Sequence, residues 1–125
     1  MIKNALLGNR DGMDASTQVA EPAEAQERCP LTGALEAIGG KWTLIILYYL
    51  GEQKRRFAEL QRLMPSISHK VLTETLRGLE QHDLVRRTVF DEVPPRVEYA
   101  ISEHGRTVLP LIEAVRVWGR VHIER

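Results

Sequence analysis

The sequence lacks the features that would assign it to a class at once: several cysteines, a long apolar run and an excess of one charge. It has 125 residues and one cysteine, Cys29, which excludes an intrachain disulfide and argues against a thiolate metal site within one chain. The longest apolar run, Leu44 to Leu50, is too short to span a bilayer, and no apolar segment of signal-peptide length lies near the N-terminus. We therefore expect a protein of the reducing cytoplasm with no membrane partner.

The net charge of the chain is zero, so it does not indicate what kind of partner the protein binds. Seventeen Lys and Arg balance seventeen Asp and Glu, so the total gives no indication of nucleic-acid binding. Residues 54–106 hold ten basic against eight acidic residues, a surplus of only two. Any DNA-binding surface must therefore arise by folding the basic residues onto one face.

The chain divides near residue 29. Residues 1–28 contain no aromatic residue and are interrupted by Pro22, so we interpret them as an N-terminal arm that is either flexible or ordered by a partner chain. Residues 29–125 carry the regular patterns and are predicted to form one domain. Its first helix covers residues 30–38, and a second helix, apolar on most sides, covers 41–50 and stops at Gly51.

A helix-turn-helix follows. A short amphipathic helix is predicted at 57–64, Pro65 breaks it, and Ser68 is a good N-cap for a longer helix from 69 to about 82. The buried face of this longer helix is predicted to consist of Leu72, Leu76 and Leu79.

A β-hairpin and a last helix complete the domain. Alternating side chains predict strands at 85–90 and 96–101, and two prolines force the segment between them to project as a loop, or wing. Ser102 caps the last helix, and Pro110 should bend or interrupt it. We therefore predict a mainly α fold with a small β-hairpin, a winged helix-turn-helix.

Seven sequence blocks carry a family resemblance in order and spacing: Cys29-Pro30, Ile38 to Leu47, Arg56 to Leu60, Ile67 to Glu80, Leu84 to Phe90, Glu92 to Tyr99 and Gly105-Arg106. Together they resemble the HxlR-type winged-helix regulators of the MarR-like superfamily over about residues 29–119. The resemblance implies a dimeric, cytoplasmic, DNA-binding transcriptional regulator. It does not extend to residues 1–28.

The outer face of the predicted helix 69–82 supplies groups for DNA binding, which needs cations near phosphates and a protruding element that fits the major groove. The first turn of such a helix points into the groove, so our base-edge candidates are Ser68, His69, Lys70 and Thr73. Arg77 lies further along, where it reaches phosphate or base. The family varies at the position of His69, so the resemblance does not fix the base preference. The alternative is that these residues form only a solvated face.

The wing and the turn before the helix-turn-helix add further cations. Arg96, at the wing tip, is predicted to contact the minor groove or a phosphate; alternatively, it pairs with Asp91 or Glu92 within the loop. Arg86 and Arg87 lie on the strand that leads to the tip. Arg56 and the two basic residues before it are placed to touch the DNA backbone, or else form a solvated turn.

The apolar stripe of the last helix predicts a homodimer. This helix is too apolar to stand alone, and the resemblance implies that it joins the first helix of each chain in the dimer interface. The aromatic residues Trp42, Tyr48, Tyr49 and Trp118 are predicted to be core, the alternative being a ligand pocket. A two-fold dimer places two recognition helices about 34 Å apart on a near-palindromic operator.

Cys29 precedes Pro30 at a helix N-terminus, where the helix dipole favours the thiolate. Some HxlR-type regulators use a cysteine here to sense oxidants or electrophiles, so the resemblance makes Cys29 a redox-sensing candidate for an oxidant or small-molecule effector. The alternative is a half-buried cysteine that only packs.

The resulting hypothesis is a sequence-specific DNA-binding transcriptional regulator whose partners are double-stranded DNA and a second copy of the chain. The alternative is a winged-helix protein-interaction module without DNA affinity. The four histidines show no metal-ligand spacing, and no phosphate-binding glycine loop or nucleophile motif occurs. We therefore predict no metal, no cofactor and no enzymatic activity.

Overall fold

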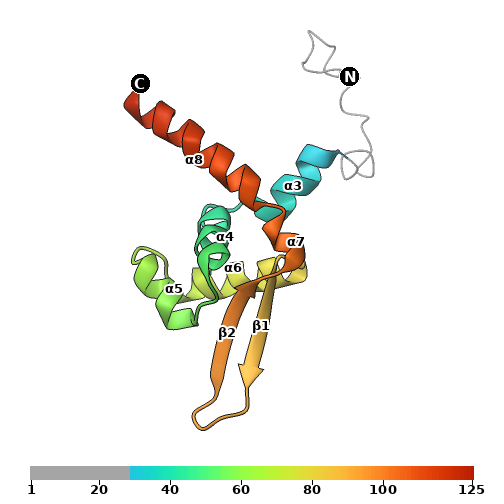
Figure 1. Ribbon diagram of the computed structural model, residues 1–125, viewed down its shortest axis with the longest axis vertical. Coiled ribbons are helices and arrows are strands. Elements are labelled where there is room, and N and C mark those ends of the chain that lie inside the picture. Colours follow the sequence, from blue (N-terminus) through green and yellow to red (C-terminus); the bar gives the residue numbers. More distant parts are fainter. Residues whose placement is uncertain (1–28) are drawn as a thin grey trace. The chain divides into compact units, whose positions relative to one another are not determined.

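The computed structural model describes residues 29–125 (Figure 1). The chain divides into two units, Met1–Glu36 and Ala37–Arg125. The predicted arm, residues 1–28, lies outside the described residues. Helix α3 (Pro30–Ile38) begins in the first unit and ends before Gly39, as predicted.

The second unit has the predicted element order and is mainly α with one two-stranded antiparallel sheet. Its elements are α4 (Thr43–Glu52), α5 (Phe57–Leu63), α6 (His69–Gln81), β1 (Val85–Phe90), β2 (Arg96–Ile101), α7 (Glu103–Arg106) and α8 (Leu109–Glu124). Figure 1 shows the hairpin projecting away from the helices, with the loop 91–95 at its far end. The predicted winged helix-turn-helix fold is confirmed.

The predicted end of α4 at Gly51 is wrong. The helix starts at Thr43, two residues later than predicted, and continues through Gly51 to Glu52. A Cβ atom on Gly51 would lie 2.8 Å from Leu109 Cδ2, at the start of α8. The glycine is therefore used for its small volume, which lets α8 approach α4, and not to end the helix.

The core lies between α4, α5, α6 and the base of the hairpin. Its fully buried side chains are Ile46, Leu47, Leu50, Leu60, Leu72, Leu76 and Leu79. The three leucines predicted for the inner face of α6 are all among them. Because they fix which side of α6 faces inward, they also fix which side chains point to solvent.

The hairpin register places Arg87 opposite Tyr99 and Phe90 opposite Arg96. Opposed residues share a face of an antiparallel pair, so Arg87 and Tyr99 lie on one face and Arg96 on the other. Arg55 extends the pairing: its N–H donates to the Tyr99 carbonyl at 2.9 Å and its carbonyl accepts from the Tyr99 N–H at 2.8 Å.

The predicted interruption of the last helix at Pro110 is confirmed, since α7 and α8 are separate helices and Pro110 lies in the first turn of α8. The predicted core role of the aromatic residues is wrong for Tyr48 and Trp118 within one chain. Tyr48 is 39% exposed and Trp118 is 64% exposed, whereas Trp42 and Tyr49 pack against the core. Among the described residues, no helix is both long and apolar enough to cross a membrane.

Candidate nucleic-acid interface

The start of α6 is fixed by Ser68. Its Oγ accepts a hydrogen bond from the Val71 N–H at 3.1 Å, which satisfies one of the N–H groups that a helix start leaves unpaired. Ser68, His69 and Lys70 are all exposed. The first turn of α6 therefore presents polar side chains to solvent, directly opposite the buried leucine face.

Three of the four base-edge candidates already have contacts within the chain. Ser68 Oγ is the helix cap, Thr73 Oγ1 donates to the His69 carbonyl at 2.9 Å, and the His69 ring lies 4.6 Å from the Phe57 ring between centroids. A capping hydroxyl that accepts keeps its proton, and a hydroxyl that donates keeps its lone pairs. Ser68 can thus still donate to a base, and Thr73 can still accept.

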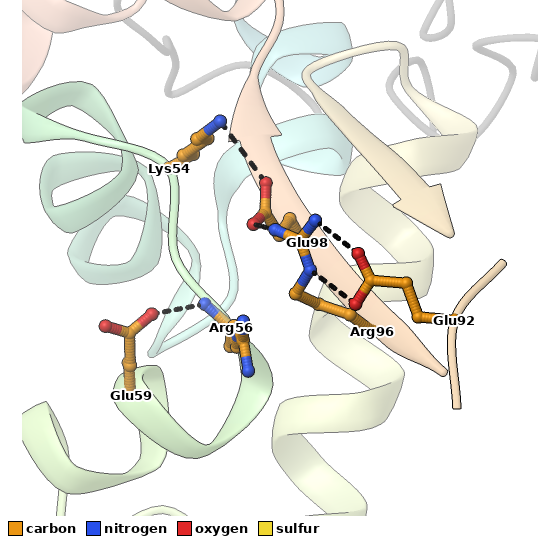
Figure 2. Close-up of polar contacts among 6 residues, drawn as sticks. All are labelled: Lys54, Arg56, Glu59, Glu92, Arg96 and Glu98. Carbon is orange, nitrogen blue, oxygen red and sulfur yellow. Dashed lines mark hydrogen bonds and ion pairs between the residues drawn. The ribbon is translucent and has the colours of Figure 1, made fainter. Parts of the chain in front are cut away.

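Arg96 is held inside the wing. Its Nη2 lies 2.9 Å from Glu92 Oε2, and its Nη1 pairs with Glu98 (Figure 2). Its guanidinium also lies 3.9 Å from the centre of the Phe90 ring. The hydrogen bond from Arg96 lowers the pKa of Glu92 and is the largest effect. Desolvation opposes it, and the positive charges of Arg96 and Arg56 lower the pKa further by smaller amounts. The alternative in which Arg96 pairs with Glu92 therefore holds in this structure.

Arg96 is not the only cation near the wing with an acidic partner. Lys54 Nζ lies 3.4 Å from Glu98 Oε1 (Figure 2), and Arg55 Nη2 lies 2.8 Å from Glu52 Oε1. Arg56 uses its backbone N–H to donate to Glu59 Oε1 at 2.7 Å, while its side chain is exposed. Within residues 29–125, the candidate cations that form no ion pair are Arg56, Lys70, Arg77 and Arg86.

A polar cleft between α6 and the hairpin was missed by sequence reasoning. It has a volume of about 420 Å³, and Arg77, Glu80, Arg87 and Tyr99 contribute to its walls. Arg87 Nε lies 3.5 Å from Glu80 Oε1 across the cleft. Strand alternation alone could not have found it, because Arg87 and Tyr99 share a face only through the register between the two strands.

Cys29 is exposed and lies immediately before α3, and its carbonyl accepts from the Gly33 N–H at 3.0 Å. The structure places it at the helix N-terminus where the sequence predicted it. Within the part of the chain that the structure describes, no three His, Cys, Asp or Glu side chains are grouped to hold a metal ion.

A short helix, a tight turn, a capped helix with an exposed polar face and a projecting hairpin define a winged helix-turn-helix domain, a DNA-binding class. Residues 37–125 match the family described as HxlR-like helix-turn-helix. The chain belongs to this family and is an HTH-type transcriptional regulator.

The names of similar proteins agree with this assignment. The chain is 47% identical over 91 residues, 73% of this chain and 72% of the relative, to the uncharacterized HTH-type transcriptional regulator YtcD of Bacillus subtilis. It is 44% identical over 94 residues, 75% of this chain and 72% of the relative, to an uncharacterized HTH-type regulator of Methanothermobacter thermautotrophicus. Among solved structures, the redox regulator HypR in its oxidized form gives a TM-score of 0.72 at 43% identity, covering 74% of this chain and 96% of that chain. The interaction module without DNA affinity is not favoured.

Proposed function

We propose that the protein binds double-stranded DNA sequence-specifically as a homodimer, with the first turn of α6 in the major groove and the wing beside it. The observation that carries this proposal is the outer face of α6, where Lys70 and Arg77 are exposed and form no ion pair within residues 29–125. Such cations replace condensed counterions on phosphates, which supplies sequence-independent affinity.

Side chains at the start of α6 would then contact the base edges in the major groove. Ser68 acts as a donor, Thr73 as an acceptor, and Lys70 donates to acceptor atoms such as guanine O6 and N7. His69 completes this set. Arg56, Arg77, Arg86 and, once released from its acidic partners, Arg96 contact the backbone.

The exposed stripe on α8 supports a homodimer. Leu111, Val115, Trp118 and Val121 are 44–64% exposed and follow one another at helical spacing. The stripe adjoins an apolar groove of about 300 Å³, lined in part by Leu44, Ile45 and Tyr48 of α4. A continuous apolar surface of this kind marks an association site. We infer that the same surface of a second chain covers it.

The function is tested by duplex binding of the full chain against salt concentration. We expect log affinity to fall linearly with log salt, by about 0.9 for each phosphate contacted. Lys70→Ala combined with Arg77→Ala should weaken binding and reduce this slope without changing dimerisation. If the double variant bound duplex with unaltered affinity, the α6 assignment would be wrong.

We also propose that an oxidant or electrophile regulates the protein through Cys29. The similarity to HypR, which is named a redox regulator, and the exposed position of Cys29 before α3 support this proposal. The helix dipole favours the thiolate. An oxidant converts the thiolate to a sulfenic acid, which condenses with a thiol of another chain or a small thiol to give a disulfide and water, whereas an electrophile forms an adduct with the thiolate directly. Alkylation at neutral pH should outpace that of an unstructured cysteine peptide. An equal rate, with DNA affinity unchanged after oxidation, would end the proposal.

A further inference from the structure

The cleft between α6 and the hairpin carries more positive than negative charge. Arg77 and Arg87 contribute to its walls from two different elements, and the carboxylate of Glu80 neutralises only one of them. Tyr99 also lines the cleft, and its hydroxyl makes no side-chain hydrogen bond within residues 29–125. Burial raises the pKa of Tyr99, so its hydroxyl keeps its proton and remains a donor at neutral pH. Two guanidiniums and a phenol form a donor set suited to a phosphate.

The position of the cleft matches the course of the DNA backbone. A helix in the major groove and a wing in the neighbouring minor groove are separated by one sugar-phosphate strand, because that strand is the wall between the two grooves. If α6 and the hairpin dock in this way, the sugar-phosphate strand of the DNA must cross the space between them. The cleft lined by Arg77, Arg87 and Tyr99 lies between these two elements.

We propose that this cleft binds a phosphate of the DNA backbone, with Arg87 and Tyr99 acting together with Arg77. In the free protein, Glu80 holds Arg87 at 3.5 Å, and the entering phosphate takes the place of the carboxylate. Arg87 and Tyr99 thereby become DNA-contacting residues beyond those on the first turn of α6. The inference rests on the proposed function, since it needs α6 in the major groove.

The test measures duplex affinity against salt for the full chain, using two duplexes of unrelated sequence. Arg87→Gln should weaken binding to both by a similar factor, roughly tenfold, and reduce the slope of log affinity against log salt by about 0.9. Tyr99→Phe should weaken binding by a few-fold and leave the slope unchanged, because the lost hydroxyl is neutral. Arg106→Gln removes an exposed cation on α7, outside the cleft, and should change neither quantity.

Two further results separate the two claims. If Lys70→Ala reduces the slope but Arg87→Gln behaves as Arg106→Gln does, the cleft is not a phosphate site and the proposed function stands. If the wild-type protein binds neither duplex at low salt, both claims fail.

Competition with inorganic phosphate at constant ionic strength distinguishes the source of the anion. Displacement of DNA at sub-millimolar phosphate would show a site for a free anion and overturn the assignment to the DNA backbone.

Discussion

At the scale of single residues, Arg96 shows how an internal anion competes with DNA. The wing arginine is paired with Glu92 and Glu98 and stacked on Phe90, so its charge is not available to a phosphate until Glu92 gives way. The lowered pKa of Glu92 keeps its carboxylate ionised at neutral pH. The Glu92–Arg96 pair contributes fully to folding stability when the pH is above the pKa of a free glutamate. This contribution is lost as the pH falls through the lower pKa that Glu92 has in the folded state.

Removing the charge of Glu92 should strengthen DNA binding. We expect Glu92→Gln to raise duplex affinity by roughly two- to fivefold at low salt, because Arg96 then keeps only Glu98 as an acidic partner and one negative charge is removed from the wing tip. Glu113→Gln is a matched control: Glu113 holds Arg116 through the same pair of oxygens, at 2.9 and 3.1 Å, but on α8. It should leave affinity unchanged. Weaker binding by Glu92→Gln, measured by fluorescence anisotropy, would show instead that the pair is needed to shape the wing.

Gly105 gives a residue-scale test of the fold. A Cβ atom there would lie 2.2 Å from the Leu84 carbonyl oxygen, a backbone atom that cannot turn aside. Gly105→Ala should therefore lower the free energy of unfolding by about 2–3 kcal/mol. Gly78→Ala is the control, because nothing lies within 4 Å of its Cβ position in α6. This substitution should raise the free energy of unfolding by about 0.5–1 kcal/mol. Urea unfolding measures both, and equal effects would contradict the packing around Gly105.

At the scale of elements, α8 carries a surface that one chain leaves exposed. Only Ile112 of this helix is buried, although the helix is rich in large apolar side chains. The sequence predicted that the helix needs another surface to pack on, and it predicted Trp118 as a core residue, which its 64% exposure contradicts within one chain. The first prediction agrees with the exposure of the helix. The second is wrong because apolar periodicity shows that a face must be buried, but not in which chain.

A charge on the α8 stripe should break the dimer. Val115→Glu places an unpaired carboxylate in the proposed interface and should raise the dimer dissociation constant by at least roughly tenfold. Arg120→Glu places a carboxylate on an exposed position of α8 that points away from Val115 and Trp118, and it should leave association intact. Sedimentation velocity would report both. A dimer unaffected by Val115→Glu would place the interface elsewhere.

At the scale of the whole molecule, patterns local in sequence were predictable and contacts between elements were not. The spacing of Leu72, Leu76 and Leu79, with Ser68 before them, determines both the helix and its outer face. Whether Arg96 meets a phosphate or Glu92 depends on side-chain geometry across two strands, so the sequence left both open. The Arg87–Glu80 contact needs the strand register and the placement of α6 together. No single-element pattern contains that information.

The central claim, that two copies of α6 read successive turns of one DNA face, is tested most directly by hydroxyl-radical footprinting. The duplex used would be one selected by the full chain from a random pool. We predict two protected backbone regions related by a two-fold axis, with centres about 34 Å, or one helical turn, apart. A single protected region without an inverted repeat, or no protection at low salt, would contradict the account.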